Sequence, residues 1–403
     1  MTTMLAHTLP GNAATASSSA VTASVVSLEP GLSPYRADWE RLFASVAAQP
    51  STSYEWMHAL TSSHLQSQDR FALVKLARGN HTIGFVPLVA KRLTVMHCPV
   101  TLLTPMDEGH GTHSDLLAES VDEEVSRAFL TSLARLDVHW DVFRMSRLLD
   151  GHPLLEHATT VGRVRGLAAS QVRAGDASYF LVLPATYEEY LAERSAKFRN
   201  HLKRTERRIN AMDGVQVIER SSPGEVESAY DWLMEVERKS WKQGHGTAIT
   251  AVNRQLRFYR ELCSGAAAAG RLHLQFLALQ NEPAAFNLGY ISGGCYYYLK
   301  TSFAEQHRTL GVATYLRARL VEALIERGVR DLDFPAEPYE WERQWTTTVR
   351  WHKVLTVYRS TIAGRALSLI ERFRHRDAGN ATRVDHADPK SHRAPKSDEE
   401  AES

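Results

Sequence analysis

The sequence predicts a mixed α/β (α+β) fold in two halves, each a mostly antiparallel twisted sheet flanked by helices. Three apolar runs, 272–279, 284–291 and 295–301, follow one another with turn residues between them, as in an antiparallel meander. A helix and a short strand near 331–334 come next. The first half of the chain repeats this order of elements, which indicates a degenerate internal duplication.

The elements of the first half follow from apolar periodicity and turn residues. They are helices over 38–48 and 53–60, strands over 71–77, 81–89 and 100–103, a helix over 121–136 and a strand over 140–145. Arg78-Gly79-Asn80 separates the first two strands and is a hairpin signal. A segment over 152–170 then connects the two halves.

The second half adds three helices before the meander. Its predicted elements are a strand over 178–183, helices over 186–212, 225–242 and 253–263, the three meander strands, a helix over 314–327, the strand near 331–334 and a last strand over 351–359. Val312, Leu316, Leu320, Ala323 and Leu324 recur every three or four residues and predict one apolar face of the helix before Gly328.

Both ends of the chain differ in composition from the middle. Residues 1–26 are rich in Ala, Ser and Thr, and residues 371–403 are polar, so we expect both segments to be disordered. This leaves 27–170 as the first half and 171–370 as the second.

The charge and cysteine content narrow the class of protein. The 47 basic and 46 acidic residues nearly cancel, which gives no argument for binding DNA. No apolar run reaches the ~18 residues of a membrane helix, and no signal peptide is apparent. Cys98, Cys263 and Cys295 are scattered, which fits a reducing cytoplasm.

A polar segment in the first half contains two histidines and several carboxylates. It runs from Asp107 to Asp115 and includes Glu108, His110 and His113. The spacing matches no standard zinc pattern, and we predict no metal. Three interpretations stay open: metal ligands, a flexible polar loop, and a loop that faces a substrate.

The loop before the helix over 314–327 has the pattern Arg308-x-x-Gly311-x-Ala313. The N-terminus of a helix presents unpaired N–H groups and a positive partial charge. Small residues allow an anion to approach this backbone closely, and Arg308 adds a charge, so the pattern is typical of a pyrophosphate site. The alternative is an ordinary loop with a glycine at the start of a helix.

This pattern resembles the acyl-CoA loop of the GNAT (GCN5-related N-acetyltransferase) superfamily. Further pieces resemble its cellulose-biosynthesis (CelD/BcsL-like) branch, which is related to the FemAB peptidyl transferases. They are Ser53-Tyr-Glu-Trp56, Ser195-Ala-Lys-Phe-Arg199, Glu237-Arg-Lys-Ser-Trp241, the strands over 270–301, and Asp333-Phe334 with Glu337-Pro-Tyr339. The resemblance implies two tandem GNAT-like halves, of which the second binds the cofactor.

The resemblance also implies a site and a reaction. The reaction is direct transfer from acetyl-CoA or another acyl-CoA to an amine or hydroxyl acceptor, in exopolysaccharide or cell-envelope biosynthesis. Asp333 and Glu337 are the candidate bases and Tyr339 the candidate acid; His307 is an alternative base. The residues expected to contact the cofactor are Tyr298, Leu299, Lys300, Thr301, Arg308, Thr309, Leu310, Gly311, Val312, Ala313 and Thr314.

Two other functions remain open at this point. Lys197, Arg199, Lys203, Arg204, Arg207 and Arg208 give the helix over 186–212 a basic surface, which is either a solvated face or an electropositive rim. Such a rim is the support for a FemAB-like enzyme that uses aminoacyl-tRNA. Glu340 stands where relatives usually have lysine, with Arg343 as the candidate substitute, and this departure favours a non-catalytic CoA-binding or scaffold protein.

Overall fold

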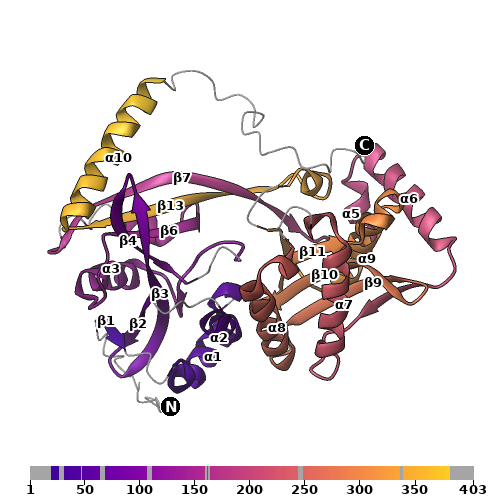
Figure 1. The fold of residues 1–403 in the computed structure, drawn as a ribbon, viewed down its shortest axis with the longest axis horizontal. Coiled ribbons are helices and arrows are strands. Elements are labelled where there is room, and N and C mark those ends of the chain that lie inside the picture. The colour runs from indigo at the N-terminus through magenta and orange to yellow at the C-terminus, as the bar shows by residue number, and fades with distance from the viewer. Residues whose placement is uncertain are drawn as a thin grey trace, which may run out of the picture.

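The computed structural model describes residues 20–26, 31–46, 48–63, 69–106, 111–158, 161, 164–243, 248–335 and 339–381. The strands of these residues join in a single sheet, and helices flank it (Figure 1). The predicted mixed α/β class with a mostly antiparallel sheet is confirmed. No helix in the described ranges is both long enough and apolar enough to cross a membrane.

Thirteen strands form the sheet. They are β1 (Val21–Val26), β2 (Arg70–Arg78), β3 (His81–Val95), β4 (Cys98–Pro105), β5 (Leu117–Ala118), β6 (Val142–Leu149), β7 (Leu167–Val182), β8 (Val215–Glu219), β9 (Leu272–Leu279), β10 (Glu282–Ser292), β11 (Cys295–Phe303), β12 (Asp331–Asp333) and β13 (Val349–Arg359).

The α-helices lie between these strands and after the last one. They are α1 (Arg36–Ser45), α2 (Tyr54–Ser63), α3 (Glu123–Ser132), α4 (Pro153–His157), α5 (Tyr187–Ala192), α6 (Ala196–Asn210), α7 (Val226–Lys239), α8 (Asn253–Ala268), α9 (Val312–Glu326) and α10 (Ile362–Ala381).

The order of the strands shows an internal repeat. From one edge the sheet reads β1-β2-β3-β4-β6-β13, and from the other edge it reads β8-β9-β10-β11-β12-β7. The pairs β4–β6 and β11–β12 are parallel, and each is connected through a helix, α3 or α9. The first half therefore has the same strand, loop, helix and strand arrangement as the second, as the sequence predicts.

The last strand of each set comes from the other half of the chain. β7 follows the first half in sequence but pairs with β12 at Phe180, Leu181 and Val182. β13 comes at the end of the second half but pairs with β6. β7 and β13 also pair with each other and run side by side across the top of Figure 1. This exchange of β7 and β13 between the halves makes the two half-sheets continuous. The boundary between the halves, expected at residue 170, falls inside β7.

A shared core also joins the two halves. Helices α1 and α2 of the first half and α7 and α8 of the second contribute to the same buried cluster, which includes Trp39, Trp56, Phe258 and Phe276. The ring of Trp56 meets that of Phe258 edge-on at 5.3 Å. Burial of large aromatic rings is strongly stabilising, so this cluster fixes the halves against each other.

The structure corrects several boundaries. Val21–Val26, expected to be disordered, forms β1 because its residues pair with β2 at an open edge. Residues 371–381, expected in a disordered tail, belong to α10, which packs on β7 and β13. The helix expected over 186–212 is broken at Glu193–Ser195, where Ser195 caps α6 by accepting from Phe198 N. The strand β8 was not predicted from the sequence. Residues 1–19 and 382–403 lie outside the described residues.

Candidate active site

The loop after β11 ends at a glycine in the left-handed conformation. The short 3-10 helix η7 (Glu305–Leu310) follows β11, and Gly311, with φ +73°, leads into α9. A residue with a side chain seldom adopts this conformation, so the backbone itself requires glycine here. The first N–H groups of α9 lack partners within the helix. The predicted strand, loop and helix are confirmed, with the helix starting at Val312 rather than Thr314.

Helix α6 packs against this loop. Arg208 Nη2 donates to the carbonyl oxygen of Leu310 at 2.9 Å. A Cβ atom placed on Gly311 would lie 3.1 Å from Cγ2 of Thr205. The loop is therefore held from the α6 side with little free space, and Arg208 puts one basic charge of the predicted rim beside it.

The charge of Arg308 is less available than the sequence predicts. Its Nε lies 2.6 Å from Oε1 of Glu305, and its guanidinium lies 5.7 Å from the centroid of the Phe303 ring. An anion at this loop would therefore compete with Glu305 for Arg308. Of the other predicted loop residues, Thr309 is exposed, Leu310, Ala313 and Thr314 are half-buried, and Val312 is buried.

The sheet opens into a fork beside this loop. β11 pairs with β12 at three positions only, which end at Tyr297 opposite Asp333. Beyond them β11 continues to Phe303 along β10, and no other described strand pairs with its second edge. Leu299 is an extra residue in the register between Tyr298 and Lys300, that is, a β-bulge. Along this edge β11 has no ladder hydrogen bonds to another described strand, and the carbonyl oxygen of Thr301 accepts from Lys242 Nζ.

The side chains along this stretch are used within the fold. Tyr298 donates its hydroxyl proton to Oδ1 of the buried Asn287. Thr301 Oγ1 donates to the carbonyl oxygen of Phe286 at 3.1 Å, and Lys300 Nζ lies 5.7 Å from the Tyr259 ring. A ligand bound along β11 would therefore meet mainly its backbone. The expected contact of residues 298–301 with the cofactor stays a prediction.

Asp333 lies at the apex of the fork and is almost completely buried. Its Oδ2 lies 3.4 Å from Arg350 Nη1 of β13 and 3.4 Å from Nδ1 of His113. His113 belongs to the polar segment of the first half. The structure therefore brings one predicted catalytic residue together with a histidine and an arginine that come from distant parts of the sequence.

Burial sets the protonation of the neighbouring groups. It raises the pKa of the Cys295 thiol and of the Tyr297 phenol, and the charge of Asp333 raises both further. Both groups are therefore protonated at neutral pH, and Cys295 is a poor nucleophile. Burial likewise lowers the pKa of His352, so that its ring is neutral. His352 Nε2 lies 2.9 Å from Ser178 Oγ.

The predicted acid, Tyr339, lies on the other side of the sheet from Asp333. Its ring stacks on Trp341 with centroids 6.2 Å apart, and Trp341 in turn packs against Tyr298 and Phe334. Tyr339 precedes the 3-10 helix η8 (Glu340–Gln344) and is 41% exposed. In that helix Glu340 and its candidate substitute Arg343 are both exposed. Glu337 lies outside the described residues.

The alternative base, His307, sits within η7. Burial lowers the pKa of His307, and the positive charge of Lys239 lowers it further. Its Nε2 lies 3.2 Å from Nε2 of Gln306. This histidine is therefore next to the loop rather than at the apex of the fork.

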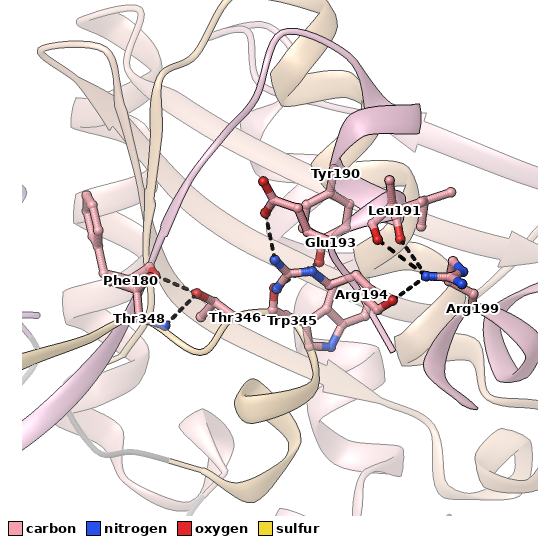
Figure 2. Close-up of polar contacts among 10 residues, drawn as sticks. Phe180, Tyr190, Leu191, Glu193, Arg194, Arg199, Trp345, Thr346 and Thr348 are labelled. Carbon is pink, nitrogen blue, oxygen red and sulfur yellow. Dashed lines mark hydrogen bonds and ion pairs between the residues drawn. The ribbon is translucent and has the colours of Figure 1, made fainter. Parts of the chain in front are cut away.

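The Ser195–Arg199 motif has a structural role. Arg199 Nη1 donates to the carbonyl oxygens of Leu191, Ala192 and Arg194, where α5 ends (Figure 2). Arg194 and the hydroxyl of Tyr190 both donate to the carbonyl oxygen of Trp345. These contacts hold the segment after η8, where Thr346 Oγ1 donates to Phe180 O at 2.8 Å. Lys197, Lys203, Arg204 and Arg207 are exposed, which leaves them as the solvated part of the basic surface.

Sequence reasoning missed two cations near the fork, the half-buried Arg350 and the buried Arg317. Arg350 lies with its guanidinium 3.1 Å from the Phe180 ring centroid. Arg317 of α9 is 5% exposed; its guanidinium lies 3.6 Å from the Trp341 ring centroid, and its Nε donates to the Tyr298 hydroxyl at 3.4 Å. An arginine between the apolar residues Leu316 and Ala318 was the available signal.

The polar segment with His113 is placed only in part. Asp107, Glu108, Gly109 and His110 lie outside the described residues. Within the part of the chain that the structure describes, no group of His, Cys, Asp or Glu side chains is arranged to hold a metal ion.

Comparisons with known proteins place this geometry in context. Residues 196–343 match the acetyltransferase (GNAT) domain family, over less than half of the chain. The structure of FemX is similar with a TM-score of 0.55 at 12% identity, covering 82% of this chain and 98% of FemX. A tandem GNAT protein from the clavulanic acid biosynthesis pathway has a TM-score of 0.43 at 13% identity. The match covers 83% of this chain and 98% of that protein.

A third similar structure is the C-terminal domain of a putative lysylphosphatidylglycerol synthetase from Agrobacterium fabrum. Its TM-score is 0.47 at 11% identity, and the match covers 71% of this chain and 84% of that one. A comparison by sequence with curated proteins finds no significant match. The chain therefore shares the fold of FemX, and its residues 196–343 match the GNAT acetyltransferase domain family.

Proposed function

We propose that the protein is an acyl-CoA-dependent N- or O-acyltransferase whose donor site is the fork between β11 and β12. The observation that carries the proposal is the position of Gly311, in the left-handed conformation at the start of α9, beside an edge of β11 with which no described strand pairs. N–H groups of Val312 to Thr314 at the start of α9 would bind the pyrophosphate, with Arg308 released from Glu305. The N–H of Gly311 already donates to the carbonyl oxygen of Arg308 at 3.1 Å. The backbone of Tyr298 to Thr301 would hold the pantetheine arm and thioester.

The reaction needs few groups once both substrates are held together. The acceptor nitrogen or oxygen attacks the thioester carbonyl, the C–S bond breaks, and the acceptor proton leaves to a base. N–H groups of the bulged strand can stabilise the developing oxyanion. We assign the base function to the group of side chains around Asp333, with Glu337 as the other candidate, and propose Tyr339 as the group that protonates the CoA thiolate.

The biological setting belongs to the same proposal. The resemblance to the CelD/BcsL-like branch supports an acceptor from exopolysaccharide or cell-envelope biosynthesis, modified in the cytoplasm, where acyl-CoA is made. The acceptor site would lie between the two halves, on the side of the sheet that Asp333 faces.

The experiment that tests the donor site is calorimetric titration of acetyl-CoA into wild type, Gly311→Glu and Gly328→Glu. Both glycines have positive φ, +73° and +69°, so both variants carry a similar backbone penalty. Gly328 lies at the other end of α9, and a Cβ atom placed on it would have no other atom within 4 Å. We expect wild type and Gly328→Glu to bind and Gly311→Glu to fail. If wild type binds no acyl-CoA of any length, the proposal is wrong.

A FemAB-like transfer from aminoacyl-tRNA is the second candidate. The exposed side chains of Lys203, Arg204 and Arg207 on α6 favour it, together with the fold shared with FemX. Binding of tRNA that weakens steeply with salt, and that is lost when these three residues become glutamine, would support this donor. Binding of acetyl-CoA without turnover would instead support the non-catalytic alternative.

A further inference from the structure

His113 and Asp333 come from different halves of the molecule and meet at the apex of the fork. His113 Nδ1 lies 3.4 Å from Asp333 Oδ2, and the side chains are 11% and 2% exposed. The His113 ring also lies beside that of Tyr297, with centroids 6.4 Å apart. No hydrogen bond from a described residue reaches His113 Nε2. The pair is therefore nearly buried. Nδ1 of His113 lies beside Asp333 and Thr112, while Nε2 has no hydrogen-bond partner among the described residues.

The internal repeat explains why a loop of the first half reaches this point. The segment with His113 follows β4, just as η7 and Gly311 follow β11 in the second half. In the first half this position has no Arg-x-x-Gly-x-Ala pattern. The loop that corresponds to the proposed donor loop instead carries a histidine to the fork of the other half.

Several contacts fix the position of this loop. Arg147 Nη1 donates to Gly111 O at 2.9 Å, and Ser114 N donates to Arg147 O at 3.1 Å. His152 Nε2 lies 3.0 Å from Asp115 Oδ1. Arg147 itself has φ +59°, which is unfavourable for a residue with a side chain. Strained backbone of this kind persists where the surrounding structure holds it, and it is common at functional sites.

The charges around the pair favour one tautomer. The Asp333 carboxylate can only accept hydrogen bonds when ionised, and the same Oδ2 lies 3.4 Å from Arg350 Nη1. The hydrogen-bond partner of His113 Nδ1 is Thr112 Oγ1 at 3.2 Å, a hydroxyl that can accept a proton from Nδ1–H. The negative charge of Asp333, 3.4 Å from the same nitrogen, favours the tautomer with the proton on Nδ1 and the lone pair on Nε2.

We propose that His113 is the general base of the transfer, and that Asp333 is the residue that positions it. In the step, His113 Nε2 takes the proton from the acceptor amine or hydroxyl while the acceptor atom bonds to the thioester carbon. The C–S bond then breaks, the thiolate of CoA takes up a proton, and His113 returns its proton to solvent. The acceptor site is thus completed by the first half, and its substrate is an amine or an alcohol. This inference rests on the proposed function.

The test measures release of CoA thiol from acetyl-CoA with glucosamine and ethanolamine as probe acceptors, alongside calorimetric binding of acetyl-CoA. We expect His113→Gln to lower the rate about 100-fold or more and to leave acetyl-CoA binding unchanged. Imidazole should restore part of the rate in His113→Ala. His58→Gln, a change at an exposed histidine on α2, serves as the matched control and should keep the wild-type rate.

The outcomes separate the two proposals. If wild type binds no acyl-CoA, the proposed function fails. If acetyl-CoA binds and His113→Gln reacts within a few-fold of wild type, the role of His113 is wrong while the donor site stands.

Nitrogen-15 NMR of the histidine rings reports which ring nitrogen of His113 carries the proton. It needs no turnover, so it tests the role of His113 even if neither probe acceptor reacts. A proton on Nδ1 of His113 in wild type, which is lost in Asp333→Asn, supports the proposed His113–Asp333 pair. A neutral His113 ring with its proton on Nε2 in wild type overturns the proposal.

Discussion

Glu55 on α2 forms an ion pair with Arg271, directly before β9, with 2.9 Å between Arg271 Nη1 and Glu55 Oε1. The hydroxyl of Tyr290 donates to the same carboxylate oxygen, and the Arg271 guanidinium lies 4.5 Å from the Phe43 ring centroid. One carboxylate of the first half thus holds two groups of the second. Since the proposed catalytic pair also spans the two halves, this contact helps to keep the site assembled.

Replacement of Glu55 by alanine should destabilise the protein. The change leaves Arg271 and the buried hydroxyl of Tyr290 without their partner, and the loss of a charged hydrogen-bond partner costs about 1–3 kcal/mol. Urea unfolding checks this. Glu40→Ala, which removes an exposed i,i+4 pair with Arg36, is the control and should change little. Equal effects of the two changes would contradict a special role for Glu55.

Gly289 of β10 should tolerate no side chain. A Cβ atom there would lie 2.0 Å from Cζ of the buried Tyr296 ring on β11. Gly289→Ala must displace this ring, and overpacking of this kind typically costs about 1–3 kcal/mol or more. Tyr296→Leu makes room, so the double variant should be more stable than the sum of the single changes predicts. A double-mutant cycle by thermal unfolding measures the coupling, and strict additivity would disprove the clash.

Local patterns predicted most of the second half. The turns between β9, β10 and β11 depend on a few neighbouring residues, and so do the helix ends at Gly311 and Gly328. Such local features can be predicted directly from the sequence. In these cases the physical cause of the structure lies within the segment itself. Asp333 was a candidate on other grounds, because the resemblance to GNAT enzymes implies a base close to Tyr339.

Long-range pairing explains what could not be predicted. Val21–Val26 contains three valines but belongs to a longer segment rich in Ala, Ser and Thr, and it forms a strand because it pairs with the edge of β2. The exchange of β7 and β13 depends on the whole sheet. Likewise, His113 and Asp333 are joined by folding across more than half of the chain, and no spacing rule links them.

Arg199 should matter for stability and not for donor binding. Its guanidinium donates to backbone carbonyls at the end of α5, so Arg199→Ala leaves these without a cation and should cost about 1 kcal/mol. Lys203→Ala, an exposed change on the same helix, should leave stability unaltered. Urea unfolding and acetyl-CoA titration of both variants separate the effects. Loss of acetyl-CoA binding in Arg199→Ala, without loss of stability, would instead assign this arginine to the ligand.

His273 should make the stability of the protein depend on pH between about 4 and 6.5. Burial lowers the pKa of His273 from 6.5 to about 4, and the charge of Glu219, 3.6 Å from its Nε2, opposes the shift only in part. In the described structure neither ring nitrogen makes a hydrogen bond. Within this pH window His273 binds a proton in the unfolded chain but stays neutral in the folded protein. The free energy of unfolding therefore rises with pH.

The contribution of His273 is therefore greatest above pH 6.5 and falls as the pH decreases toward 4. His273→Leu removes the titrating group, and because the ring nitrogens have no hydrogen bonds to lose, the variant should be nearly as stable as wild type at pH 8. At lower pH the variant should become progressively more stable than wild type. Urea unfolding of both proteins at several pH values measures the difference, in which the other histidines cancel. A difference that stays constant from pH 8 to pH 4 would show that His273 is protonated in the folded protein as readily as in the unfolded chain.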